Sequence, residues 1–294
     1  MKIAVIGGAN TDICGAPSGR LLLKDSNPGA VTVKPGGVGR NIAHDLILLG
    51  CEVMFVTAAG TDLFSRNVLE GCSALGMDVS KCLSVEGHSG CVYLYITDET
   101  GDMNIAVSDM SVPDCITPEY LAGIMADINE CDAIVIDANI SADAADYICS
   151  SARVPVFADA VSSAKAVKLS GVLDRLAMFK PNRYEAERLT GESDPEKAAL
   201  ALVRAGVKRA YVSCGDRGMI AADENGAVHI EAEKIAVVNA NGAGDACTAA
   251  IVCASLLGRS LEECARCGIK AGSVTAMSSE TNSPDLTRAA VGLE

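Results

Sequence analysis

Short apolar runs alternate along the chain with longer stretches in which apolar residues recur at helical spacing. The runs have the composition of buried β-strands, and the clearest lie at 2–8, 52–60, 132–138, 154–160 and 209–215. The intervening stretches are typical of amphipathic helices. Strands that are apolar on both faces and separated by helices predict a mostly parallel sheet that is covered on two sides. The predicted class is therefore α/β.

Two segments, at about 11–34 and 88–112, interrupt this alternation because neither has a helical period. The second contains two β-type runs joined by Asp-Glu-Thr-Gly at 98–101, which predicts a hairpin. We expect both segments to form a small accessory sheet, inserted in a single domain that spans residues 1–294. Such a sheet suits a lid, and its open edges suit pairing with a second chain as a homodimer.

Composition narrows the range of partners. The 294 residues are 49% hydrophobic, which supplies a sizeable core, and they carry a net charge of −14 with no run of Lys or Arg. Nucleic acid is therefore excluded as a partner. An anionic substrate would have to be held by backbone dipoles and a few placed cations. The thirteen cysteines are scattered and lie mostly in apolar runs, which predicts reduced core thiols and no zinc set.

The chain shows no targeting or membrane segment. Its first residues read as a β-strand and not as a signal peptide, and the longest apolar stretch, at 246–257, is shorter than the roughly 20 residues of a membrane span. We expect no membrane partner and a cytoplasmic location.

The stretch "NANGAGDA" at 239–246 places small residues and Asp245 where a helix begins. The first turn of a helix has N–H groups without intrahelical partners and binds anions when no side chain obstructs it. Asp245 is then either a simple helix cap or a base that accepts the proton of an attacking hydroxyl while the N–H groups stabilise a transferring phosphoryl group. The stretch alone leaves both interpretations open.

Three other motifs are ambiguous when taken singly. "PGGVGRNIA" at 35–43 is a glycine-rich turn that leads into a helix, but neither a dinucleotide fingerprint nor a phosphate-binding P-loop is present. Asn182 and Glu185 in "KPNRYEAERL" indicate either an exposed helix start or a carboxylate that holds Mg²⁺ through water. "SCGDRG" at 213–218 is ordinarily a hairpin turn.

The order of these motifs is more specific than any one of them. Asn-x-Asp after the first strand, G-G-x-G-x-N, N-x-x-E, S-x-G-x-x-G and G-A-G-D follow one another along essentially the whole chain. This arrangement resembles the PfkB, or ribokinase-like, family of sugar and nucleoside kinases. The resemblance implies a three-layer α/β/α core with a mostly parallel sheet and a small β-sheet lid, and a reaction that uses ATP and Mg²⁺.

The resemblance also implies roles for individual residues. Asp245 would be the general base that activates a 5′-type hydroxyl, beside an anion hole formed by Gly242, Ala243 and Gly244. The residues implied to bind substrate through its sugar are Asn10, Asp12, Gly36, Gly37, Arg40 and Asn41. Those implied to bind ATP are Asn182, Glu185, Ser213, Gly215 and Gly218, with Asn282 on the adenine side and Glu185 holding Mg²⁺ through water.

A nucleobase has to be recognised by polar groups, since a purely apolar pocket discriminates poorly between bases. Ser26, Asn27 and Asp109, on the predicted lid segments, are candidates for this role. Lys165 either faces the substrate cleft or is a solvated helix residue. The identity of the nucleoside stays open, and a kinase for a free sugar and a non-catalytic nucleoside sensor on the same fold stay open as alternatives.

The chain departs from the family pattern just before G-A-G-D. Many relatives have Thr and Asp where this chain has Asn241 and Asn239. The Asp of those relatives helps to build a monovalent-cation site, so the resemblance here implies a weaker site or none.

Overall fold

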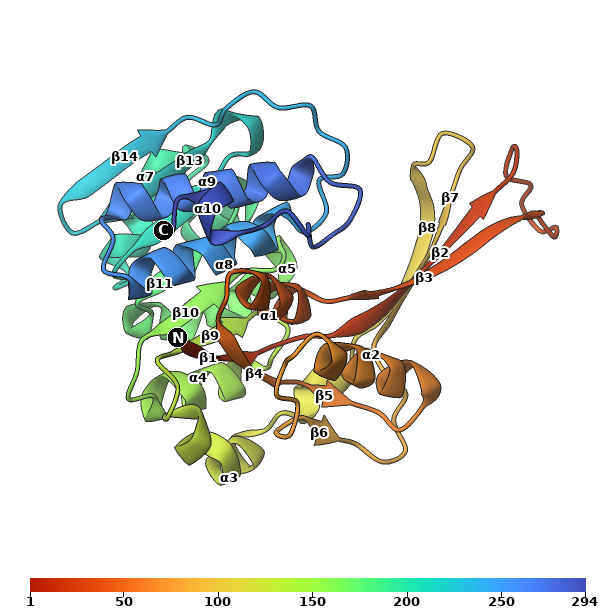
Figure 1. Ribbon diagram of the computed structural model, residues 1–294, viewed down its shortest axis with the longest axis horizontal. Coiled ribbons are helices and arrows are strands. Elements are labelled where there is room, and N and C mark those ends of the chain that lie inside the picture. The colour runs from red at the N-terminus through yellow and green to blue at the C-terminus, as the bar shows by residue number, and fades with distance from the viewer.

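The computed structural model describes residues 1–294 and centres on an eight-stranded sheet of order β14-β13-β12-β11-β10-β9-β1-β4 (Figure 1). The last six strands in that order are mutually parallel, and β13 and β14 extend the sheet in antiparallel fashion. The α/β prediction is therefore confirmed. The strand bounds are β1 Lys2–Ile6, β4 Glu52–Val56, β9 Ala133–Asp137, β10 Val156–Asp159, β11 Met178–Lys180, β12 Ala210–Ser213, β13 Met219–Asp223 and β14 Gly226–Ile230.

Helices cover both faces of this sheet because its strands are apolar on both sides. Along β1, Ala4 and Ile6 enter one hydrophobic cluster while Ile3 and Val5 enter the other. The first cluster includes side chains of α3 (Pro118–Ile128), α4 (Ala142–Ser151), α6 (Arg183–Thr190) and α7 (Pro195–Arg204). The second includes those of α1 (Val38–Leu48), α2 (Leu63–Ala74), α8 (Ala243–Leu256), α9 (Leu261–Ala276) and α10 (Arg288–Val291).

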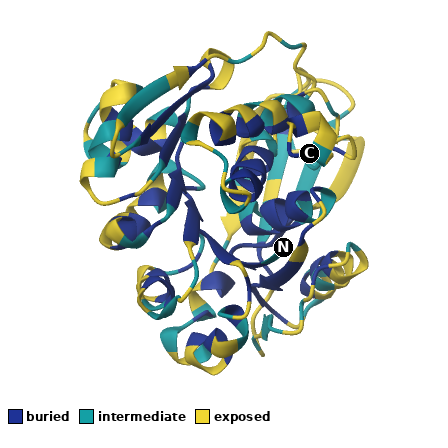
Figure 2. Ribbon diagram, turned by 60° about the vertical axis from the view of Figure 1, so that its left-hand side comes forward, coloured by how far each residue is buried: buried dark blue, intermediate teal, exposed yellow.

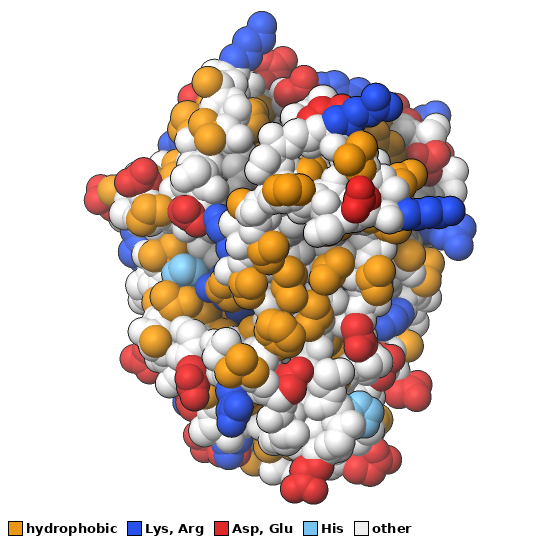
Figure 3. All heavy atoms as spheres, turned by 90° about the vertical axis from the view of Figure 1, so that its right-hand side faces the viewer, with side chains coloured by type: hydrophobic (Ala, Val, Ile, Leu, Met, Phe, Trp, Pro, Cys, Tyr) orange, Lys and Arg blue, Asp and Glu red, His pale blue; other side chains and the backbone are white.

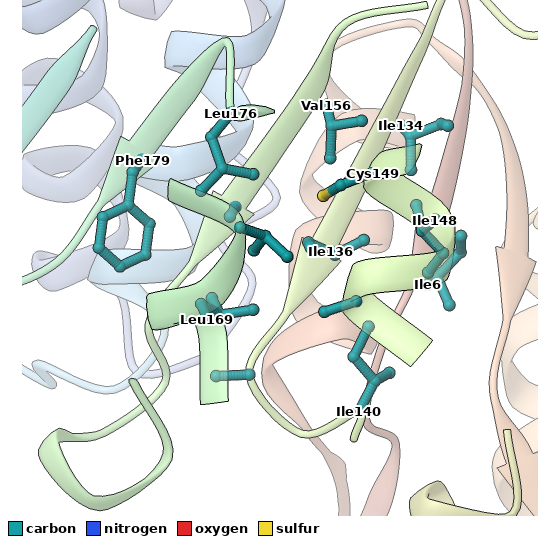
Figure 4. Close-up of a cluster of buried hydrophobic side chains, with 14 of the residues drawn as sticks. Ile6, Ile134, Ile136, Ile140, Ile148, Cys149, Val156, Leu169, Leu176 and Phe179 are labelled. Atoms are coloured by element: carbon teal, nitrogen blue, oxygen red, sulfur yellow. The ribbon is translucent and has the colours of Figure 1, made fainter. Parts of the chain in front are cut away.

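The two clusters give the molecule its rigid frame. In Figure 2 the central strands and the inward faces of the helices are buried. Figure 4 shows part of the first cluster, where Ile134 and Ile136 of β9 point at Ile148 of α4. Short elements link the layers: β5 (Ala58–Ala59), β6 (Leu83–Ser84), α5 (Ser163–Ala166) and the 3₁₀ segments η1 (Val112–Cys115), η2 (Val167–Arg175) and η3 (Gly215–Arg217). All thirteen cysteines are free thiols, and most are buried.

A second sheet of four strands, which we call the accessory sheet, projects from the core (Figure 1). Its order is β3-β2-β7-β8, with β2 Asn10–Pro17, β3 Gly29–Gly36, β7 Val92–Thr97 and β8 Met103–Asp109. The strands come from the two segments that lack a helical period, and the predicted hairpin at 92–109 is present.

The two faces of the accessory sheet differ in chemistry. Register pairs Val33 with Ile13, Ile13 with Leu94 and Leu94 with Val107, so these apolar side chains share one face. Asp12, one position along β2, points to the opposite face. Val33 is 57% exposed and Val107 is 65% exposed. Figure 3 views the molecule from this end and shows hydrophobic side chains gathered across its middle. The apolar face is therefore open to solvent.

The chain has no helix that is both long and apolar enough to cross a membrane.

Candidate active site

The site forms where the amino end of α8 meets the carboxyl ends of the parallel strands. Gly242 precedes the helix with a φ of 81°, and a Cβ at this position would collide with the carbonyl oxygen of Thr281. Only glycine fits both constraints. The N–H groups of Gly242, Gly244 and Asp245 have no hydrogen-bond partner in the protein, and that of Ala243 makes only a long bond of 3.4 Å to the carbonyl of Ala240. The loop therefore presents donors suited to an anion.

Asp245 lies in the first turn of α8 but does not cap it. Its Oδ2 accepts a hydrogen bond of 2.8 Å from Nδ2 of Asn41 on α1, and the side chain is 9% exposed. Burial raises the pKa of Asp245 to about 8, with a further contribution from the Asp159 carboxylate, while Asn41 and Lys180 act in the opposite direction. A carboxyl with such a pKa is suited to accept a proton near neutral pH.

The residues predicted to bind the sugar are linked to this carboxyl through Asn41. Asn10 pairs with Gly36 across β2 and β3, and its Nδ2 donates to Oδ1 of Asp12 at 2.5 Å. The Asp12 carboxylate lies against Gly36, where any Cβ would collide with it. The glycine turn at 36–37 then leads directly into α1, which carries Asn41 to Asp245. Segments far apart in the sequence thus form one continuous polar surface.

Arg40 and Asn282 occupy the far side of Asn41. Nη1 of Arg40 donates to Oδ1 of Asn282 at 2.7 Å and to Oδ1 of Asn41 at 3.1 Å. Nδ2 of Asn282 donates to Oδ1 of the buried Asp45 at 2.8 Å. The amide of Asn282 is thereby used to join the C-terminal segment to α1. The structure places it with the predicted substrate residues and not beside Asn182, where an adenine-side role was expected.

The residues predicted to bind nucleotide lie at the ends of β11 and β12. Asn182 and Ser213 are paired by an isolated parallel bridge, and Gly215 and Gly218 form the turn that follows Ser213. Asn182 caps α6, and Oε2 of Glu185 accepts from the N–H of Asn182 at 2.7 Å. The motif therefore does begin a helix, with Tyr184 exposed and Glu185 buried in its first turn.

Glu185 is 5% exposed, and burial raises its pKa. Its Oε1 makes no hydrogen bond within the protein, so one carboxylate oxygen stays available beside the cap. The chain shows no group of three or more His, Cys, Asp or Glu side chains that could hold a metal ion by themselves.

Sequence reasoning missed a cavity of about 250 Å³ between α9 and the segment after β14. Its lining includes Ile230, Ile235, Ile269, Ser273 and Met277. The main chain of Ile230 lies so close to Gly218 that a Cβ there would collide with it, so the cavity adjoins the S-x-G-x-x-G turn. The helical periodicity of 261–276 did not distinguish residues that line a cavity from residues that pack in the core.

Lys165 is bonded to the segment that follows β9. Its Nζ donates to Oδ1 of Asn139 at 2.6 Å, and Nδ2 of Asn139 donates to Oδ2 of Asp137 at 2.7 Å. The same Asp137 oxygen accepts from the N–H groups of Gly8 and Gly39, which ties the end of β9 to the segment after β1 and to the first turn of α1. Asp137 and Asn139 were not singled out in the sequence, because a strand end gives no motif to recognise.

The three polar lid candidates are dispersed. Ser26 and Asn27 lie in the exposed tip of the β2–β3 hairpin, far from α8 in Figure 1, and the Asn27 amide bonds to the main chain of Leu22. Asp109 lies at the base of the accessory sheet opposite Val92 and accepts from Oγ of Ser111 at 3.0 Å. The structure therefore does not bring Ser26 and Asn27 to Asp245.

Asn239, in the segment before G-A-G-D, uses its side chain to join two loops. Its Nδ2 donates to the carbonyl of Ser279 at 3.3 Å, and its Oδ1 accepts from the N–H of Asn241 at 3.0 Å. An uncharged amide thus stands between two loops next to the anion-binding turn.

The chain is similar to known kinases in sequence and in fold. The chain is 38% identical to pseudouridine kinase from Escherichia coli K12 over 98% of its own length and 95% of the relative's. It is 27% identical to guanosine-inosine kinase from Exiguobacterium acetylicum over 95% of each chain. A carbohydrate kinase structure from Agrobacterium tumefaciens superimposes with a TM-score of 0.89 at 29% identity, covering 99% of this chain and 95% of that one.

Arabidopsis thaliana ribokinase, whose structure was solved with ribose and ATP, has the same fold, with a TM-score of 0.83 at 22% identity over 98% of this chain and 96% of that one. The model of the pfkB family of carbohydrate kinases matches residues 1–288. The chain is therefore a kinase that belongs to the PfkB family, a phosphotransferase with an alcohol group as acceptor.

Proposed function

We propose that this kinase transfers the terminal phosphoryl group of ATP to the 5′-hydroxyl of a nucleoside, and that pseudouridine is its preferred substrate. The observation that carries the proposal is the buried Asp245, held by Asn41 beside a turn of unpaired N–H groups. The similarity to a pseudouridine kinase over nearly the whole chain supports the choice of acceptor.

In this proposal Asp245 accepts the proton of the 5′-hydroxyl as that oxygen attacks phosphorus. Asn10, Asp12 and Asn41 hold the sugar hydroxyls and orient the attacking oxygen. The unpaired N–H groups at the start of α8 stabilise the charge on the transferring phosphoryl group. The groups that would bind substrate and accept the proton are held in place by the sheets, by α1 and by the start of α8.

The nucleotide would lie across Asn182, Ser213 and the turn at 215–218, with its base toward the cavity between α9 and the segment after β14. The free oxygen of Glu185 fits a carboxylate that holds a hydrated Mg²⁺. When bound, that ion would neutralise charge on the phosphates.

Lys165 would contact the substrate from the strand ends, because its ammonium bonds to Asn139 just after β9. Of the candidates for contact with the nucleobase, Asp109 lies nearest the core, at the base of the accessory sheet. Ser26 and Asn27 would reach a bound nucleoside only if the accessory sheet closed over it, which is the motion expected of a lid.

A panel of pseudouridine, uridine, adenosine, inosine, ribose and fructose, assayed with ATP and Mg²⁺, tests the function. We expect the highest kcat/KM for pseudouridine. Asp245→Asn is the matched control and should lose nearly all turnover, since an amide cannot accept the proton. Preference for another acceptor would replace the substrate assignment, and no ADP release from any acceptor would favour a nucleoside-sensing protein.

Asp245→Asn should also change how stability depends on pH. The folded pKa of Asp245 is about 8, well above the unfolded value near 3.9. Between these values the folded state keeps a proton that the unfolded state has lost, so this carboxyl lowers stability as pH rises. We expect the variant to gain at least ~1 kcal/mol relative to the native protein between pH 5 and pH 8.5.

Urea unfolding at several pH values measures this gain. The exposed Asp102→Asn is the control, for which we expect no such trend. Parallel stability curves for native protein and Asp245→Asn would show that the carboxyl is not buried as described.

The Asn239 amide already joins the two loops near G-A-G-D, so we propose a weak monovalent-cation site there or none. Initial rates in KCl and in choline chloride at equal ionic strength should be similar. Asn239→Asp is the matched variant and should increase any dependence on K⁺, because it restores a negative charge. Strong activation of the native protein by K⁺ would contradict this proposal.

We further propose that the apolar face of the accessory sheet forms a homodimer interface. Val31, Val33, Ile105 and Val107 are each more than half exposed on strands that share this face. Val107→Glu should convert a dimer to a monomer in light scattering after size exclusion, whereas Leu257→Glu, at the end of α8, should not. A monomeric native protein, or a dimeric Val107→Glu variant, would refute the interface.

A further inference from the structure

Beneath the start of α8 lies an ion pair to which the function proposed above gives no task. Asp159 ends β10 and Lys180 ends β11, and the two are direct neighbours in the parallel ladder. Nζ of Lys180 lies 3.2 Å from Oδ2 of Asp159, and both residues are 4% exposed. Charges so deeply buried are retained at a considerable desolvation cost.

The pair is joined directly to the turn that carries the unpaired N–H groups. Oγ1 of Thr248 donates to Oδ2 of Asp159 at 2.6 Å and lies 3.2 Å from the carbonyl of Gly244. From the other side, a Cβ at Gly244 would be only 3.6 Å from Nζ of Lys180. The ion pair therefore supports the floor of the loop at 242–245.

The charges around Asp245 are unbalanced without Lys180. The groups that face Asp245 come from four elements: Asn41 and Asp45 from α1, Asp137 from β9, Asp159 from β10 and Lys180 from β11. Lys180 is the one cation among them. The carboxylates disfavour ionisation of Asp245 and the ammonium favours it.

We propose that Lys180 and Asp159 are positioning residues that hold the loop at 242–245 on the sheet and place charges of opposite sign beside Asp245. The proposal rests on the function proposed above only where Asp245 is taken as the base. The ion pair itself touches neither substrate nor phosphate in this scheme. Its effect reaches the reaction through Asp245 and through Thr248.

The sign of each neighbour's effect on Asp245 follows from the charge of that neighbour. The pKa of Asp245 is raised by the Asp159 carboxylate and lowered by the Lys180 ammonium. Burial is the largest single effect on Lys180 and lowers its pKa, but Asp159, Cys247, Glu185 and Asp245 together outweigh burial, so the pKa of Lys180 stays above its ordinary value. Lys180 therefore remains charged over the whole working range of pH.

Two charge-removing variants test the proposal by moving Asp245 in opposite directions. Asp159→Asn keeps an acceptor for Thr248 but removes a negative charge, so the Asp245 midpoint should fall by ~1 pH unit or more. Lys180→Met removes the cation, so the midpoint should rise by a similar amount. Carboxyl ¹³C NMR of the protein without substrate measures this midpoint, with the Asp245 signal assigned by its loss in Asp245→Asn.

The acid limb of kcat/KM against pH should follow the midpoint: it should move to lower pH in Asp159→Asn and to higher pH in Lys180→Met. Thr248→Val removes the hydrogen-bonded support of the loop at 242–245 without changing any charge. It should lower kcat with little change in KM and leave the Asp245 midpoint unmoved. If Lys180→Met does not fold, as judged by circular dichroism, Asp159→Asn still decides the electrostatic claim alone.

An unchanged midpoint in Asp159→Asn, or shifts of the same sign in both variants, would overturn the proposal. If the midpoints move as expected in NMR while no acceptor is phosphorylated, the proposed function fails and the role of the ion pair stands.

Discussion

The site depends on one hydrogen bond that crosses the structure, from Asn41 on α1 to the buried carboxylate of Asp245 on α8. Both helices lie on the same face of the sheet, and each begins at a glycine that no other residue could replace without a clash. The bond therefore joins the sugar-side turn to the anion-binding turn. It also gives an otherwise isolated buried carboxylate a donor, which a buried charge needs.

A parallel sheet favours this arrangement because its strands all end at one edge. Asp137, Asp159 and Lys180 are the last residues of β9, β10 and β11, and all three are almost completely buried. Asp137 accepts hydrogen bonds from the N–H groups of Gly8 and Gly39. Asp159 pairs with Lys180 and accepts a hydrogen bond from Thr248. The edge thus holds several charges out of water. Burial raises the pKa of Asp245, Asp159 and Asp137 raise it further, and Lys180 lowers it.

The fold could be predicted from the sequence, and Asp245 with its glycine turn could be singled out there, because these signals are local. Apolar strands and glycine turns such as 242–244 are visible in a few consecutive residues. Contacts between distant segments are not: Asn282 was expected near adenine but bonds to Arg40, and Ser26 and Asn27 lie at a hairpin tip. The pairing of Asp159 with Lys180 could not be predicted for the same reason: Lys180 begins the stretch "KPNRYEAERL", but only the strand order makes it a neighbour of Asp159.

Side chains alternate between the two faces of the accessory sheet, so one face can be polar and the other apolar. Asp12 points from one face toward the glycine turn, while Val33 and Leu94 lie on the other face and are exposed. An apolar face of this kind is costly in an isolated chain and is stabilised when a partner covers it. Because β2 carries both Asp12 and Ile13, any contact that orders the apolar face also restrains the carboxylate beside the sugar site. Association and substrate binding would then act on the same strand from opposite sides.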